Sequence, residues 1–124
     1  MTIRLLLAAF TLPLCASPLF AQERPDMRAP IATFMAAAAA DWTTTGIALS
    51  RPGVHESNPL LGFTGSRPTT TVSALIIGDV AGAWAITRYV APRKPRLARV
   101  MLYSFAAARA SMAIHNARVL SAQR

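Results

Sequence analysis

Residues 70–120 read TTVSALIIGDVAGAWAITRYV-APRKPR-LARVMLYSFAAARASMAIHNARVL, with hyphens marking a short basic linker between two apolar segments. The first segment, residues 70–90, has 21 residues, and the second, residues 97–120, is longer. As α-helices rising about 1.5 Å per residue, both can cross a hydrocarbon core of about 30 Å. Because the two linker prolines end one helix before the next begins, this stretch predicts an antiparallel hairpin of membrane-spanning helices.

Composition supports a membrane protein. The chain has 124 residues, one domain at most, of which 53% are hydrophobic and only 15% charged. Soluble domains usually carry about a quarter charged residues. The net charge is +8, and most positive residues flank the apolar segments instead of forming a stripe along one helix. This placement indicates a lipid bilayer as the partner and argues against nucleic acid.

The N-terminus has the order of a secretory signal peptide. In residues 1–21, Arg4 precedes an apolar run and a looser stretch that ends at Ala21. We expect cleavage after Ala21, with an uncleaved N-terminal anchor as the alternative. The only cysteine, Cys15, lies in this segment, so the mature chain would have no disulfide and no thiolate metal site.

The remaining chain divides into a polar linker at residues 22–30 and a helical membrane domain at residues 31–122. Residues 31–49 predict a helix, but it is a marginal span because Asp41 at its centre costs about 2.5–3.5 kcal/mol on insertion. Residues 50–69 hold three prolines and three glycines and predict a loop. The expected fold is an all-α, small helical membrane bundle with two to three mature transmembrane helices.

The sequence allows two orientations of these helices in the membrane. A cleaved signal leaves residues 22–30 outside the cytoplasm. If residues 31–49 then cross, the basic stretch 88–99 also lies outside, against the positive-inside rule. If residues 31–49 lie along the membrane or only partly enter it, that stretch lies inside.

Two charged residues lie in the middle of the hairpin. Asp79 comes about fourteen residues before the centre of the basic linker, and Arg109 about fifteen after it. In an antiparallel hairpin they reach matching depth, where an unpaired charge is costly. A structural ion pair is the plainer interpretation, and a proton or ion pathway is the alternative.

Asp41 and Thr45 share one face of their helix, four residues apart. Asp41 lies about as far before the centre of loop 50–69 as Asp79 lies after it. If these two helices pack antiparallel, both carboxylates approach Arg109. Such a site could bind a proton or a cation. Alternatively, segment 31–49 is so short that Asp41 lies at the membrane interface.

His115 lies about as far beyond the hairpin linker as Thr71 lies before it. This places His115 near the end of segment 70–90 that joins loop 50–69. We therefore expect one membrane face to bring together Glu56, Asn58, His115 and Asn116. Glu56 and His115 are candidate ligands of a divalent metal. The plainer interpretation makes His115 an interfacial residue and Asn58 a helix N-cap, followed by Pro59 at the first helical position.

Small residues four apart, Ala74, Gly78 and Gly82, form a ladder on one face of segment 70–90. Such a ladder lets another helix approach closely. It predicts either packing of this segment on residues 97–120 or a homodimer.

Three motifs resemble those of a family of short uncharacterised bacterial membrane proteins that share a domain of unknown function. They are Asp41-xxx-Thr45, Gly53-x-x-Glu56-x-Asn58-Pro59-Leu60 and His115-Asn116. The resemblance covers roughly residues 38–120 and implies a three-helix membrane core in which residues 31–49 truly span. It implies no activity, and neither the signal-like N-terminus nor the Asp79/Arg109 pair belongs to the family pattern.

These observations predict a small bacterial inner-membrane protein without a resident cofactor. A phosphate-binding glycine loop, a zinc-protease His motif and a serine elbow are all missing from the sequence. The leading hypothesis is therefore a non-enzymatic structural or assembly partner, acting as a homodimer or with another membrane protein. The alternative is a cation- or proton-handling site, or a metal-assisted membrane hydrolase, built on Asp41, Glu56, Asp79 and His115.

Overall fold

The computed structural model describes residues 25–122, and this part of the chain is all-α. In chain order its elements are α1 (Arg28–Leu49), the 3-10 helix η1 (Pro59–Thr64), α2 (Pro68–Ala85), the π-helix η2 (Ile86–Val90) and α3 (Pro95–Ala122). The expected signal peptide, its cleavage after Ala21 and Cys15 lie outside the described residues.

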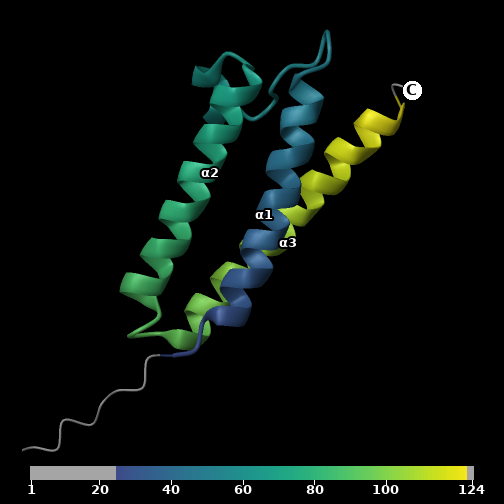
Figure 1. The fold of residues 1–124 in the computed structure, drawn as a ribbon. Coiled ribbons are helices and arrows are strands. Elements are labelled where there is room, and N and C mark those ends of the chain that lie inside the picture. Colours follow the sequence, from purple (N-terminus) through teal and green to yellow (C-terminus); the bar gives the residue numbers. More distant parts are fainter. Residues whose placement is uncertain (1–24, 123–124) are drawn as a thin grey trace, which may run out of the picture.

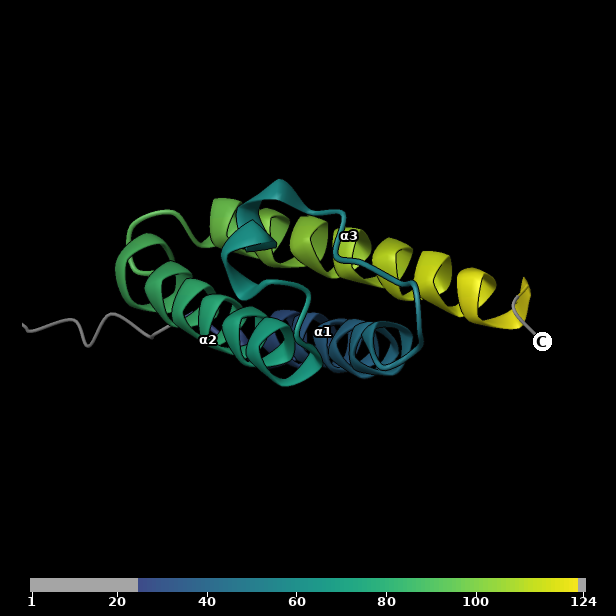
Figure 2. The same ribbon diagram turned by 90° about the horizontal axis from the view of Figure 1, so that it is seen from above.

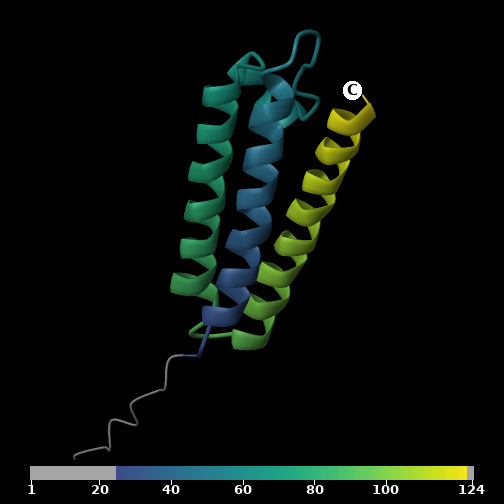
Figure 3. The same cartoon turned by 45° about the vertical axis from the view of Figure 1, so that its right-hand side comes forward.

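The three α-helices lie side by side (Figure 1; Figure 3). The start of α1 and the turn between α2 and α3 lie at one end of the bundle. Loop 50–67 and the end of α3 lie at the other. Viewed along the bundle, η1 lies over the gap between α2 and α3 (Figure 2).

The helix boundaries differ from expectation at the start of α1. The helix begins at Arg28, so the linker expected over residues 22–30 is wrong for its last three positions. Pro30 is tolerated there because the first four N–H groups of a helix have no intrahelical acceptor. Downstream, the expected cap at Asn58 is confirmed: its side chain accepts a hydrogen bond from the Leu60 N–H at 3.0 Å and begins η1.

The apolar core fills one half of the bundle, the half that contains the α2–α3 turn. Its buried residues are Met27, Phe34, Ala38, Ala83, Ile86, Ala91, Ala98, Leu102 and Ala106. Ala38 and Ala98 are completely buried, and such small side chains let helix backbones approach closely. Part of the alanine run in α1 therefore serves as a contact surface. We call this region the apolar half.

Large apolar side chains are also exposed on the outer surface of the bundle. Exposed large side chains on α2 and α3 include Ile77, Trp84, Val100 and Ile114. By length and composition, Pro68–Val90 and Pro95–Ala122 could each cross a membrane. Residues 25–122 therefore form an all-α fold in which two helices are long and apolar enough to span a membrane.

Candidate functional site

Arg109 lies near the middle of α3 and connects all three helices. Its Nη1 donates to Oδ2 of Asp41 on α1 at 2.8 Å. Its Nη2 and Nε donate to Oδ1 of Asp79 on α2 at 2.7 and 3.2 Å. The structure thus brings together the two carboxylates and the arginine that matching depth in the sequence placed near one another.

The remaining carboxylate oxygens are also hydrogen-bonded. Oδ2 of Asp79 accepts from the Trp42 indole N–H at 2.8 Å. Oδ1 of Asp41 accepts from the Thr45 hydroxyl and from Nδ2 of Asn116, both at 3.3 Å. Within residues 25–122 no buried side-chain nitrogen or oxygen lacks a partner, so the network is complete as it stands.

The network carries unequal charge. Two carboxylates face one guanidinium, and Asp41 and Asp79 are only 2% and 9% exposed. A buried charge without a full counter-charge is strongly disfavoured. One proton or one monovalent cation would remove the excess negative charge.

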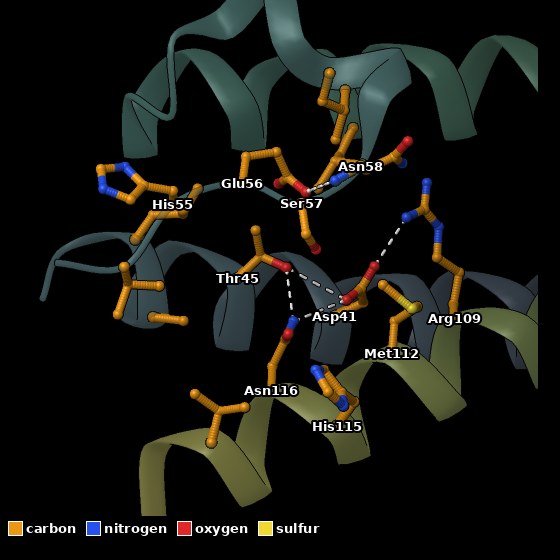
Figure 4. A pocket seen from close by; sticks show the side chains of 16 residues that line it. Asp41, Thr45, His55, Glu56, Ser57, Asn58, Arg109, Met112, His115 and Asn116 are labelled. Carbon is orange, nitrogen blue, oxygen red and sulfur yellow. Dashed lines mark hydrogen bonds and ion pairs between the residues drawn. The ribbon is translucent and has the colours of Figure 1, made fainter. Parts of the chain in front are cut away.

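A cavity of about 140 Å³ lies between this network and loop 50–58 (Figure 4). Asp41, Arg109 and Asn116 line it from the helices, and His55 and Glu56 line it from the loop. This volume has room for several water molecules. Because the loop is partly exposed and the Arg109 side chain is 22% exposed, water can reach the network from this end.

Asp79 does not line the cavity, whereas Asp41 does. The two carboxylates are therefore not equivalent. Asp79 is hydrogen-bonded to Arg109 and Trp42, and Asp41 borders a space that can hold water or an ion.

The loop is held over the cavity by its own hydrogen bonds. The Glu56 carboxylate accepts from the Asn58 N–H at 2.8 Å, and the Glu56 N–H donates to the Ser66 hydroxyl at 2.8 Å. Gly53 has φ +77°, a conformation that side-chain-bearing residues rarely adopt. The Gly53, Glu56, Asn58 and Pro59 motif thus shapes this loop and its junction with η1.

The candidate metal ligands Glu56 and His115 both line the cavity. However, His115 is exposed, and one Glu56 oxygen is bonded to its own loop. Residues 25–122 contain no group of three or more His, Cys, Asp or Glu side chains arranged to hold a metal ion. Divalent metal binding therefore stays a prediction.

The small-residue ladder does not pack α2 on α3. A Cβ atom added at Gly78 or Gly82 would meet nothing within 4 Å, and Gly78 is exposed. The interpretation that Ala74, Gly78 and Gly82 pack against residues 97–120 is therefore wrong. The closely packed small residues are instead those of α1 and the first half of α3.

Sequence reasoning missed the role of Trp42 and placed Asn116 in a different group. Asn116 contacts Thr45 at 2.9 Å and Asp41, and does not approach Glu56 within hydrogen-bond range. Asn116 lies seven residues after Arg109, which puts both residues on one helix face. This spacing was the available indication that Asn116 joins the network of Arg109. For Trp42 the only indication was its place directly after Asp41.

No protein-family model, curated protein or solved structure matches this chain. The resemblance to a family of short bacterial membrane proteins therefore stays a prediction.

Proposed function

We propose that this chain is a small integral protein of a bacterial inner membrane, with α1, α2 and α3 all crossing the bilayer. The support is the distribution of side chains, which is opposite to that of a soluble protein. Charged side chains meet in the interior, and large apolar side chains face outward. Intramembrane ionisable residues usually face the bundle interior and pair there. α1 runs beside the two apolar helices (Figure 3), so its Asp41 would reach the same depth as Arg109.

The proposed activity is the reversible binding of a proton or a small monovalent cation at Asp41. The observation that carries it is a single arginine between two carboxylates, at the inner wall of a cavity. Asp79 would act as the permanent counter-ion of Arg109. Asp41 would exchange its ligand through the cavity, because its carboxylate borders that space and Asp79 does not.

The test compares Asp41→Asn with Asp26→Asn in the full chain purified in detergent. Asp26 is exposed and outside the network. Infrared difference spectra between high and low pH, and with and without Na⁺ or K⁺, report carboxyl groups that change protonation or bind a cation. We expect a buried-carboxyl signal in the wild type and in Asp26→Asn that disappears in Asp41→Asn.

A signal that persists in Asp41→Asn would assign the response to another group and contradict the proposed site. A wild type without any buried-carboxyl response would show that the network is a fixed structural clamp.

A second candidate function, assembly with another membrane protein or a second copy, is favoured by the open outer face of α2. Gly78 and Gly82 leave space there that no part of the described chain fills. The test is Gly78→Cys in a Cys15→Ser background, reconstituted in bilayers and oxidised. A disulfide-linked dimer at high lipid-to-protein ratio would support self-assembly, and exclusively monomeric protein would contradict it.

The hydrolase alternative keeps its own test. Metal analysis of the purified protein should find stoichiometric zinc, lost in Glu56→Ala, if Glu56 and His115 help to hold a catalytic ion. A metal-free preparation that retains its fold would remove this alternative.

A further inference from the structure

The end of the bundle opposite the cavity carries a dense group of positive side chains. We call it the basic end; its members are Arg28, Arg88, Arg93, Lys94, Arg96 and Arg99. All six are exposed. They come from the start of α1, from η2, and from the α2–α3 turn and the first residues of α3, elements that meet at one end of the bundle (Figure 1).

These charges have little to neutralise them within residues 25–122. The ion pairs of this part of the chain are those of Arg109, and the first turn of α3 contains no acidic residue. Asp26 is the one described acid near this end, and its carboxylate accepts the backbone N–H of Arg28 at 2.9 Å. The basic end therefore presents a strong uncompensated positive field.

Aromatic side chains lie directly beside these charges. Trp84 and Tyr89 are 57% and 54% exposed and stack edge to face with their ring centroids 5.5 Å apart. The Arg88 guanidinium lies 5.9 Å from the Tyr89 ring centroid. Exposed Trp and Tyr next to Lys and Arg are typical of the depth at which lipid headgroups meet acyl chains.

The opposite end has a different surface. Its described basic residues are Arg51, Arg67 and Arg118, half as many as at the basic end. Its most exposed large apolar residues are Leu60 and Phe63 of η1, at 81% and 77%. The basic end is therefore distinguished by its six clustered positive residues and by the exposed Trp84 and Tyr89 rings beside them.

We infer that the basic end is a binding surface for anionic phospholipid headgroups. Charge complementarity supplies the attraction to the phosphates. The exposed apolar side chains of α2 and α3, which continue from Trp84 and from Val100, supply the surface for the acyl chains. A nucleic acid or an acidic soluble protein would satisfy the charges but would leave these apolar side chains uncovered. The inference depends on the proposed membrane insertion and is independent of the cation site.

The experiment uses the full chain in mixed micelles of a neutral detergent and a brominated phospholipid, which quenches tryptophan fluorescence on contact. Trp84 lies at the basic end and is the exposed reporter, and Trp42 is a constant background. Brominated phosphatidylglycerol is titrated against brominated phosphatidylcholine. The matched variants are Arg96→Gln with Arg99→Gln at the basic end, and Arg67→Gln with Arg118→Gln at the opposite end.

We expect half-maximal quenching at a much lower fraction of phosphatidylglycerol than of phosphatidylcholine. The basic-end pair should weaken this preference by about thirtyfold. Each Lys or Arg near an anionic surface strengthens binding by a factor of about 5.5, and this pair removes two such residues. The opposite-end pair should leave the preference unchanged.

Three results would overturn the inference. The first is equal quenching by the two lipids. The second is an equal loss in both variant pairs, which would show only a diffuse effect of net charge. The third is full competition by inorganic phosphate at matched ionic strength, which would identify a free-anion site. Circular dichroism of each variant verifies that helicity is retained.

Discussion

The two halves of this bundle are built from opposite kinds of contact. In the apolar half, α1 and α3 meet through small and aliphatic side chains such as Ala38, Ala98 and Leu102, all fully buried. In the other half, α3 diverges from α1 (Figure 1), and the space between them holds hydrogen-bonded polar side chains and the cavity. We call this second region the polar half.

The difference shows why the charges lie where they do. Arg109 comes one turn after Ala106, the last member of the apolar cluster on α3. Arg109 therefore lies at the boundary between the two halves. The closely packed apolar cluster lies on one side of it, and the cavity lies on the other. Close packing and interhelical hydrogen bonds both join helices. In this bundle close packing predominates in the apolar half and hydrogen bonds predominate in the polar half.

The largest effect should follow from removing the arginine at this boundary. Arg109→Ala leaves Asp41 and Asp79 buried with no cation between them. Breaking a buried ion pair in this way destabilises by about 3–5 kcal/mol. We expect a loss of that size in the free energy of unfolding, measured in detergent by titration with sodium dodecyl sulfate.

Adding Asp79→Ala should restore much of this loss, because one unpaired carboxylate then remains instead of two. The double-mutant cycle should give a coupling of at least about 1 kcal/mol. Arg118→Ala, at an exposed position of the same helix, is the control and should change stability by less than about 0.5 kcal/mol. Strictly additive losses would mean that Arg109 and Asp79 do not interact in solution.

Most of the fold follows from the hydropathy of the sequence and from the prolines that end its helices. Two long apolar segments separated by prolines determine α2 and α3, and residue counting from the turn brought Asp79 and Arg109 to one depth. The packing role of α1 could not be read in this way. Its contact residues are alanines, whose near-neutral hydropathy marks neither a lipid-facing nor a buried surface, so which helices they join depends on three-dimensional packing.

The candidate site was predictable only in part, for the same reason. A charge inside an apolar segment signals a buried partner, which identified Asp41, Asp79 and Arg109. Trp42 and Asn116 have polar groups that are common at many depths, so only the structure shows that they complete the network. The open face at Gly78 also required the structure, because a ladder of small residues indicates close approach without naming the partner.

The next effect concerns the apolar half. Leu102 is fully buried in its cluster, and Leu102→Ala should lower the free energy of unfolding by about 2 kcal/mol, the lower end of the usual range. The lower end is expected because an unfolded helix in a micelle still has apolar surroundings. The exposed Val100→Ala on the same helix should change little. A changed Asp41 infrared signal in Leu102→Ala would show that the two halves are not separate.

A smaller effect is expected at the loop over the cavity. Gly53 has φ +77° and open space around its Cα, so Gly53→Ala should cost about 1 kcal/mol from backbone conformation alone. Gly62→Ala is the control, since Gly62 has equally open space without a positive φ. Equal losses for the two would contradict the left-handed turn at Gly53. Stability is measured by the same denaturant titration.

The smallest effect in this series is expected for Asn116→Ala, and it tests the polar half most directly. The Asn116 amide donates to Thr45 at 2.9 Å and to Asp41 at 3.3 Å. Interhelical hydrogen bonds in a membrane protein contribute about 0.6 kcal/mol on average, so the stability loss should be of that order. The infrared signal of Asp41 should nevertheless shift clearly, because its carboxylate loses a donor. Arg118→Ala, at an exposed position of the same helix that does not line the cavity, should alter neither quantity. If the two variants behave alike, the Asn116 amide does not hold the Asp41 carboxylate, and Arg109 would be the one described α3 side chain that does.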